Sequence, residues 1–266
     1  MCKECGCGLG GGGRQTGNHT HAHHHHDHDQ ARNHAGHDHP SGPWSLTLNQ
    51  SLMEKNDRLA ARNRELFRAK GLLVLNVVSS PGSGKTTFIR ETAVRLAKSL
   101  RVGVIVGDLA TDNDAARLRT AGIPVVQITT GTVCHLDADM VFQAAARLTL
   151  DSLDVLVIEN VGNLVCPADY DLGEQLRVVL LSTTEGEDKP LKYPPLFHSA
   201  HVAIVTKSDL AAAAGFDREL ALTNLKRVSH HATRFELSAK TGQGMDTWLA
   251  FLTEQRARTN PAPAAR

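Results

Sequence analysis

The chain has 266 residues, of which 41% are hydrophobic and 4% aromatic, and its formal net charge is +1. This balance indicates neither a nucleic-acid-binding surface nor a membrane-binding one, and no apolar run reaches the length of a membrane span. The N-terminus lacks the apolar stretch of a signal peptide, so we expect a cytoplasmic protein with no nucleic-acid or membrane partner. In that compartment the five cysteines are more often thiolate ligands than disulfides.

Residues 1–44 form a low-complexity segment rich in Gly, His, Asp and Asn. This composition cannot bury enough apolar surface to offset the entropy of ordering, so we predict a disordered N-terminal tail that binds metal. The tail begins with a C-x-x-C-x-C pattern, made by Cys2, Cys5 and Cys7. Its three thiolates can converge on one ion, nickel or zinc, although a redox motif has similar spacing.

A histidine-rich tract follows in the same tail, interleaved with aspartates. Tracts of this kind bind several divalent ions with modest affinity, so storage or buffering of metal is one interpretation. Simple solvation of a polar segment is the other. The tract contains His19, His21, His23, His24, His25, His26, His28, His34, His37 and His39.

Residues 45–70 have the pattern of an amphipathic helix. Leucines recur every seven residues and other apolar residues run beside them, which places one apolar stripe on the helix. Gly71 ends the pattern. The stripe could dock a partner or pack against the rest of the chain. Its members are Leu52, Met53, Leu59, Ala60, Leu66 and Phe67.

From residue 71 to 257, apolar strands alternate with helices. We expect strands at 72–78, 102–107, 124–129, 154–159, 177–182, 201–206 and 234–238. We expect helices at 85–100, 111–121, 137–150, 217–229 and 245–256. This alternation predicts an α/β fold of the P-loop NTPase kind, with a mostly parallel sheet covered by helices on both faces and ligands at the carboxyl ends of its strands. Residues 258–266 are rich in Ala and Pro and are predicted to fray.

The first strand runs into "SSPGSGKTT" at 79–87, close to the phosphate-binding pattern G-x-x-x-x-G-K-[ST]. Ser79 replaces the first glycine. Backbone N–H groups and the following helix N-terminus would bind phosphate, Lys85 would pair with β- and γ-phosphate charge, and Thr86 would ligate Mg²⁺. A chance glycine-rich loop is the plainer alternative. The predicted nucleotide-binding residues are Ser80, Pro81, Gly82, Ser83, Gly84, Lys85, Thr86 and Thr87.

Acidic residues stand at the ends of two further strands. Asp108 follows 102–107 and Glu159 closes 154–159. Each alone is more often a turn or cap residue, but beside a phosphate loop both are candidates to hold Mg²⁺ or to position water. With Lys85 they form the predicted catalytic set. The sequence indicates no arginine finger and no catalytic glutamine, so we expect slow intrinsic hydrolysis.

Two short motifs indicate the base. "TKSD" at 206–209 resembles the guanine-reading N-K-x-D of GTPases, with Thr206 in place of Asn. The Asp209 carboxylate can accept from guanine N1–H and the 2-amino group, and the stem of Lys207 can cover the base. "SAK", which is Ser238, Ala239 and Lys240, matches a loop that offers a backbone N–H to guanine O6. The pair favours GTP and GDP over adenine nucleotides.

A second group of metal ligands lies within the predicted domain. Cys134 and His135 are adjacent, and Cys166 is seven residues past Glu159. Because both segments follow strands, we expect them at the nucleotide edge, where movement of a loop on hydrolysis would move a ligand. Thiolate plus imidazole suits Ni²⁺ or Zn²⁺, and a symmetric dimer could pool two sets. Buried structural cysteines beside a solvated histidine are the alternative.

These motifs together resemble the HypB family of hydrogenase nickel-incorporation GTPases, which are P-loop metallochaperones of the SIMIBI class. The resemblance rests on "CKECGC", "SSPGSGKTT", "GDLATDNDA", "GTVCHLDADM", "IENVGNLVCP", "LLSTTEGEDKPLKYP", "TKSDL" and "SAKTGQG". It implies GTP-promoted dimerisation, nickel handover controlled by hydrolysis, and a tight nickel site in the cysteine-rich N-terminus. It also implies a second nickel or zinc site at Cys134, His135 and Cys166.

The resemblance further implies a HypA-type nickel chaperone as a partner, docking near the 45–70 helix, and a hydrogenase large-subunit precursor as the client. Three alternatives remain open from the residues. A urease-type nickel GTPase would share the chemistry, a nickel store would use the GTPase domain structurally, and a small-molecule kinase would prefer ATP.

Overall fold

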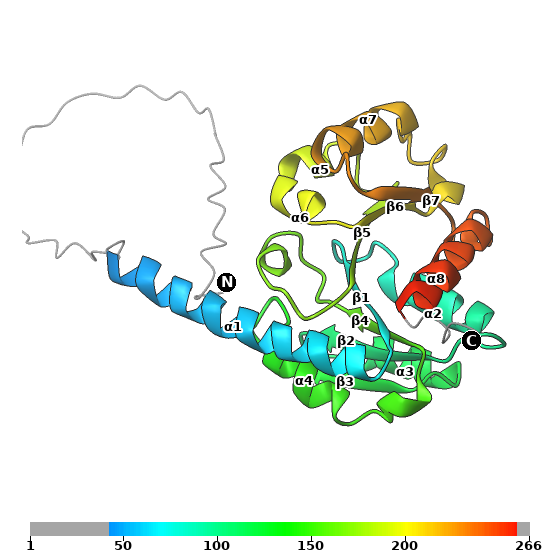
Figure 1. Ribbon diagram of the computed structural model, residues 1–266. Coiled ribbons are helices and arrows are strands. Elements are labelled where there is room, and N and C mark those ends of the chain that lie inside the picture. Colours follow the sequence, from blue (N-terminus) through cyan, green and yellow to red (C-terminus); the bar gives the residue numbers. More distant parts are fainter. Residues whose placement is uncertain (1–42, 260–266) are drawn as a thin grey trace, which may run out of the picture. The chain divides into compact units, whose positions relative to one another are not determined.

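The computed structural model describes residues 43–259, with side chains from residue 50 onwards (Figure 1). The predictions for residues 1–42, including Cys2, Cys5, Cys7 and the histidine-rich tract, lie outside the described residues, as do those for 260–266. Within the described part, none of the helices combines the length and apolar character needed to cross a membrane.

A seven-stranded sheet forms the centre of the domain, with strand order β3-β2-β4-β1-β5-β6-β7 and every pair parallel. This confirms the predicted fold class. The inner strands carry near-continuous runs of Val, Leu and Ile, as expected for a sheet covered on both faces. They are β1 (Leu73–Val78), β2 (Val102–Asp108), β4 (Val155–Glu159), β5 (Leu176–Ser182) and β6 (Val202–Thr206). The two edge strands, β3 (Val125–Thr129) and β7 (Thr233–Glu236), are partly exposed.

Helices lie on both faces of this sheet. The helices are α1 (Pro43–Ala69), α2 (Lys85–Leu96), α3 (Asn113–Thr120), α4 (Ala138–Ala145), α5 (Lys189–Lys192), α6 (Pro194–His198), α7 (Arg218–Val228) and α8 (Met245–Thr259). One core packs α2, α3 and α8 on one face, with Trp248 fully buried in it. On the other face, α4 and the end of α1 cover β1, β2 and β4, while α6 and α7 cover β5 and β6.

Helix α1 begins two residues before the predicted segment and ends at Ala69. Gly71, with φ of 62°, takes the left-handed conformation that closes a helix, and Leu72 N–H donates to the carbonyl of Phe67. Phe67 is buried against the domain, and Asn63 donates to the carbonyls of Ala138 and Leu172. The C-terminal part of α1 therefore packs on its own domain through polar as well as apolar groups.

Three helices end three or more residues away from the predicted position. α2 ends at Leu96, because the N–H groups of Ser99 and Leu100 both turn back to its carbonyl. α4 ends at Ala145, where bonds between residues three apart tighten the chain. α8 continues to Thr259, two residues into the segment predicted to fray.

Two short helices, α5 and α6, were not predicted. Each has a proline in its first turn, Pro190 in α5 and Pro194 with Pro195 in α6. Proline is favourable at that position because its missing N–H would have had no partner there. The sequence does not indicate these two helices, because four or five residues are too few to show a helical period.

Candidate nucleotide and metal site

The phosphate loop leaves β1, the central strand, and enters α2. Gly82 and Gly84 have φ of 74° and 97°, values that a residue with a side chain rarely adopts. Glycine at these two positions therefore fits a loop whose N–H groups face a ligand. The Lys85 ammonium lies 3.2 Å from the hydroxyl of Ser79 and 3.3 Å from the carbonyl of Ser80. Ser79, the departure from the usual pattern, therefore supplies an oxygen that positions this lysine.

Glu159, at the end of β4, reaches the first turn of α2. The Thr86 hydroxyl donates to its Oε1 at 2.7 Å, while Oε2 is buried with no hydrogen-bond partner among the described residues. Burial raises the pKa of Glu159 to about 7, although Thr86 and the Lys85 charge oppose this. Burial also lowers the pKa of Lys85, against the attraction of nearby carboxylates. A buried acid and base thus meet at the expected place of the γ-phosphate.

Asp108, at the end of β2, lies near the same place but is engaged differently. Its Oδ1 accepts from the backbone N–H groups of Ala110 and Thr111, at 3.0 and 3.2 Å. These are the bonds of a turn-forming aspartate. Of the two predicted acids, Glu159 therefore contacts the Thr86 hydroxyl, whereas Asp108 shapes the loop after its strand.

Glu185 is a residue of this edge that the sequence analysis did not single out. It follows β5, and its Oε2 accepts from the Ser80 hydroxyl at 2.8 Å. Burial raises its pKa, and the Ser80 bond opposes the shift. The available signal was its place just past a strand of the same parallel sheet, as for Asp108 and Glu159.

The predicted base-reading segments come together beside the loop. A cavity of about 380 Å³ is lined by residues of the phosphate loop, α2, "TKSD" and "SAK", including Thr206, Lys207, Asp209, Ser238, Ala239 and Lys240. Lys207 has φ of 57°, and its ammonium donates to the carbonyl of Gly82 at 2.7 Å. The Thr206 hydroxyl donates to the carbonyl of Ser83 at 3.1 Å. The residue that replaces asparagine thus anchors this segment to the phosphate loop.

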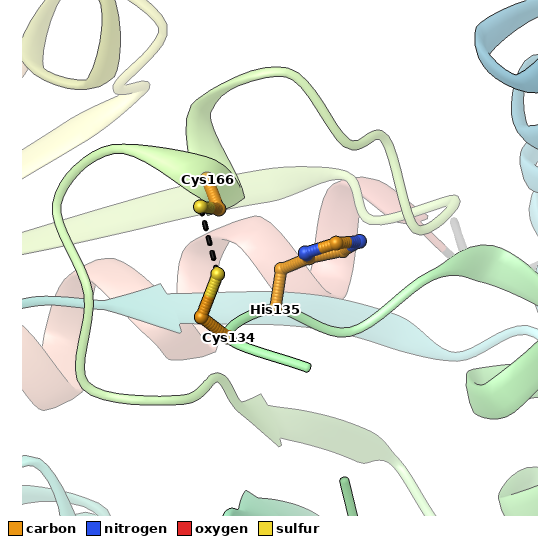
Figure 2. Close-up of side chains that lie close together, drawn as sticks. All are labelled: Cys134, His135 and Cys166. Atoms are coloured by element: carbon orange, nitrogen blue, oxygen red, sulfur yellow. Dashed lines mark hydrogen bonds between the residues drawn. The ribbon is translucent and has the colours of Figure 1, made fainter. Parts of the chain in front are cut away.

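Cys134, His135 and Cys166 also come together, as Figure 2 shows, with candidate ligand atoms all within 4.8 Å of one another. The two sulfur atoms are 2.8 Å apart. Cys134 and His135 follow β3, whereas Cys166 starts a short helical turn, η2 (Cys166–Ala168), after β4. The His135 ring stacks on Tyr170 at 3.8 Å between ring centres. Two thiols and an imidazole at this spacing have the composition of a transition-metal site.

The chain between Glu159 and Cys166 links this cluster to the phosphate loop. At Gly162 the backbone passes so close to Pro81 that an added Cβ would lie 2.9 Å from the Cα of Pro81. One residue on, the Asn163 amide donates to the carbonyl of Cys134 at 3.2 Å. The stretch from Glu159 to Cys166 therefore contacts both the phosphate loop and the segment that carries Cys134.

A phosphate-loop motif between a central parallel strand and a helix, an acid at the end of the neighbouring strand and a cavity beside the loop are the features of a P-loop NTPase. The family described as "CobW/HypB/UreG, nucleotide-binding domain" matches residues 73–236, and the chain belongs to this family. Its relatives include the hydrogenase maturation factor HypB of Escherichia coli K12, 51% identical over 211 residues, which cover 79% of this chain and 73% of that protein. The HypB of Azotobacter vinelandii is 51% identical over 213 residues, covering 79% and 70%.

Solved structures give the same grouping. The structure of HypB from Helicobacter pylori in complex with nickel has a TM-score of 0.74 and 41% identity, covering 80% of this chain and 99% of that one. The structure of HypB from Archaeoglobus fulgidus has a TM-score of 0.72 and 40% identity, covering 76% and 99%.

Proposed function

We propose that the chain is a cytoplasmic GTPase that binds nickel and delivers it, under control of its nucleotide, during maturation of the [NiFe]-hydrogenase large subunit. One observation carries the proposal: the stretch that begins at Glu159 packs against the phosphate loop at Gly162 and supplies Cys166 to the cluster with Cys134 and His135. The names of the relatives, hydrogenase maturation factors, and the nickel complex of one of them support the choice of cargo and client.

The residues at the loop fit Mg²⁺. The buried Glu159 Oε2 has no hydrogen-bond partner among the described residues, and the Thr86 hydroxyl lies beside the same carboxylate. Oxygen donors of this kind are those that Mg²⁺ prefers, and Thr86, Glu159 and Asp108 would hold it directly or through water. Bound with nucleotide, Mg²⁺ would supply positive charge to the β- and γ-phosphate oxygens. Lys85 would add a second positive charge, and Asp209 and Lys207 would orient guanine.

Nickel is the cargo of the Cys134, His135 and Cys166 cluster. Two thiolates and an imidazole suit Ni²⁺ and also Zn²⁺, so zinc is a competing occupant of the same site. Three ligands from one chain leave positions open for a second copy or for an acceptor. A GTP-dependent homodimer would close these positions, and a HypA-type chaperone or the hydrogenase precursor would exchange metal through them.

The stretch from Glu159 to Cys166 would transmit the state of the nucleotide. Thr86 and Glu159 face the place where the γ-phosphate arrives, so its loss changes what Glu159 contacts. Because Gly162 leaves no space against Pro81, a shift of the phosphate loop displaces the following residues. Asn163 then carries the displacement to the backbone of Cys134. Cargo affinity and nucleotide state become linked.

Nickel storage is the second candidate. The histidine-rich tract supports it, although this tract lies outside the described residues. Equilibrium dialysis against Ni²⁺ distinguishes delivery from storage. It uses the full chain, a Cys166→Ala variant and a Val165→Ala control in the same loop. Each is measured with GDP and with a non-hydrolysable GTP analogue. If the chain delivers nickel, one bound nickel ion should depend on which nucleotide is present. This ion should be lost in Cys166→Ala and kept in Val165→Ala. Storage predicts nickel that ignores the nucleotide and survives the substitution.

Lys85→Ala tests whether hydrolysis matters. Removing one preorganised charge should slow GTP hydrolysis by about 10²–10³-fold or more, and hydrogenase maturation should fail while nickel binding persists. Lys98→Ala, an exposed lysine just past the same helix, is the matched control. A Lys85→Ala protein that still matures hydrogenase would contradict a GTP-controlled chaperone and support a store. Preference for ATP over GTP in a panel of nucleotide-binding measurements would instead favour a small-molecule kinase.

A further inference from the structure

Histidines gather at the amino-terminal edge of the sheet, opposite to the phosphate loop. His198 ends α6, His201 precedes β6, and His230 and His231 lie in the turn between α7 and β7. The ring centres of His198 and His231 are 5.3 Å apart, and those of His230 and His231 are 5.2 Å apart. Because the strands are parallel, this edge is remote from the nucleotide and from the Cys134 cluster.

The hydrogen bonds distinguish a histidine that can bind a metal ion, His198, from one that cannot in this arrangement, His201. His198 Nδ1 lies 3.2 Å from the carbonyl oxygen of Val228, which can only accept, so Nδ1 carries the proton and Nε2 keeps its lone pair. Metal-binding histidines commonly have this arrangement. His201 is the opposite case, because its Nδ1 accepts from the backbone N–H of Arg177 at 3.0 Å, which leaves the proton on Nε2. His201 is therefore not a ligand in this arrangement.

Two of the three ring separations have the size expected for a shared ion. Two imidazoles bound to a tetrahedral ion through nitrogens at about 2.0–2.1 Å have ring centres roughly 5 Å apart. The separations of His198 from His231 and of His230 from His231 are of this size, so His231 belongs to both pairs. All three side chains are exposed, so their rings can turn to bring a nitrogen inward.

The backbone that carries the rings is fixed. Ser229 is fully buried, and its hydroxyl donates to the carbonyl of Phe197 at 2.6 Å, next to His198. The N–H of Ala232 donates back to the carbonyl of Ser229 at 3.1 Å, which closes the turn that holds His230 and His231. The end of α6 and this turn are thus held together independently of the histidines.

We propose that His198, His230 and His231 form a further metal site that binds one Ni²⁺ or Zn²⁺ ion. Neutral imidazole suits both ions, and water would fill the remaining positions. This site contains no thiolate and lies on the edge away from the phosphate loop, so its occupancy is independent of the nucleotide. It places a metal-holding position on the domain that is separate from the Cys–His–Cys cluster.

Histidine footprinting on the full chain tests the site. Diethyl pyrocarbonate modification is followed by mass spectrometry across a series of buffered free Zn²⁺ and Ni²⁺ concentrations, so that the histidine-rich tract does not alter the free metal. The three ligands should become protected with one common midpoint for at least one of the two ions, while modification of His201 stays unchanged. GDP and a GTP analogue should leave that midpoint unaltered.

Variants make the test decisive. His198→Ala should raise the metal midpoint for His230 and His231 by about tenfold or more, since even the loss of an outer-shell partner commonly costs 10–100-fold in metal affinity. His201→Ala is the control and should leave it unchanged. The proposal is overturned if neither ion protects the three histidines, or if His230 and His231 keep their midpoints in the His198→Ala protein. If thermal unfolding shows that this variant is unfolded, His231→Ala provides the same comparison through His198 and His230.

Discussion

The two halves of the nucleotide edge are attached to the phosphate loop in different ways. On the half formed by β5, β6 and β7, Lys207 and Thr206 donate to main-chain carbonyls of Gly82 and Ser83. On the half formed by β2, β3 and β4, Glu159 accepts from the side chain of Thr86, and Gly162 packs against Pro81. We call these the base half and the metal half.

The difference teaches which half is suited to respond to the nucleotide. Main-chain carbonyls do not bind phosphate, so the contacts of the base half with Gly82 and Ser83 do not depend directly on a γ-phosphate. We expect this half to change less with the nucleotide than the metal half. The Thr86 hydroxyl and the Glu159 carboxylate are groups that Mg²⁺ and phosphate would recruit. The half that carries Cys134, His135 and Cys166 is therefore the half whose contacts would change during hydrolysis.

The largest expected effect comes from removing the support of the metal half. Arg177 is buried, pairs with Glu174 at 2.9 Å, and donates to the carbonyls of Ala168 and Tyr170 at 2.9 and 2.7 Å. Arg177→Ala should lower the free energy of unfolding by about 3–5 kcal/mol, because it leaves the buried Glu174 carboxylate without its partner. Urea unfolding measures this.

The control for this substitution is Arg117→Ala, which breaks an exposed pair with Asp114. It should cost no more than about 0.5 kcal/mol. Equal losses in the two variants would mean that Arg177 does not support the metal half in the way its contacts indicate.

An intermediate effect is expected at the link between loop and cluster. Gly162→Ala adds a Cβ 2.9 Å from the Cα of Pro81, which must move one of the two segments at a cost of about 1–3 kcal/mol. Nucleotide should still bind, but the dependence of nickel affinity on GTP should weaken or vanish. Isothermal titration of Ni²⁺ with each nucleotide measures it, with Val165→Ala as control. Intact coupling in Gly162→Ala would place the link elsewhere.

The smallest effect is expected in the base half, at Glu185. Burial raises the pKa of this carboxyl in the folded protein, so the folded state keeps a proton at pH values where the unfolded chain has released it. Its contribution to stability is therefore present at acidic pH and falls as pH rises through the folded-state pKa. Glu185→Gln should flatten this slope slightly, since the side chain is only partly buried. Denaturant midpoints from pH 4 to pH 8 give the pH dependence of stability for the two proteins. A steeper decrease of stability with pH in the variant would contradict a raised pKa of Glu185.

The sequence by itself determined the parts that depend on short-range pattern. Strand and helix periods, the glycines of the phosphate loop and the lysine and threonine after them predict a parallel sheet and a nucleotide site, because each feature is complete within a few consecutive residues. The "TKSD" and "SAK" segments were predictable for the same reason. α5 and α6 escaped because they are too short to show a period.

Only the tertiary structure decided which distant side chains meet. Cys134 follows β3 and Cys166 follows β4, two strands separated by β2 in the sheet, and no sequence pattern states that order. The contact of Gly162 with Pro81, the bond between Glu185 and Ser80, and the meeting of His198 with His231 depend on the same crossovers. Short sequence motifs indicate the chemistry of their residues. The strand order and the packing of the loops determine which distant residues they contact.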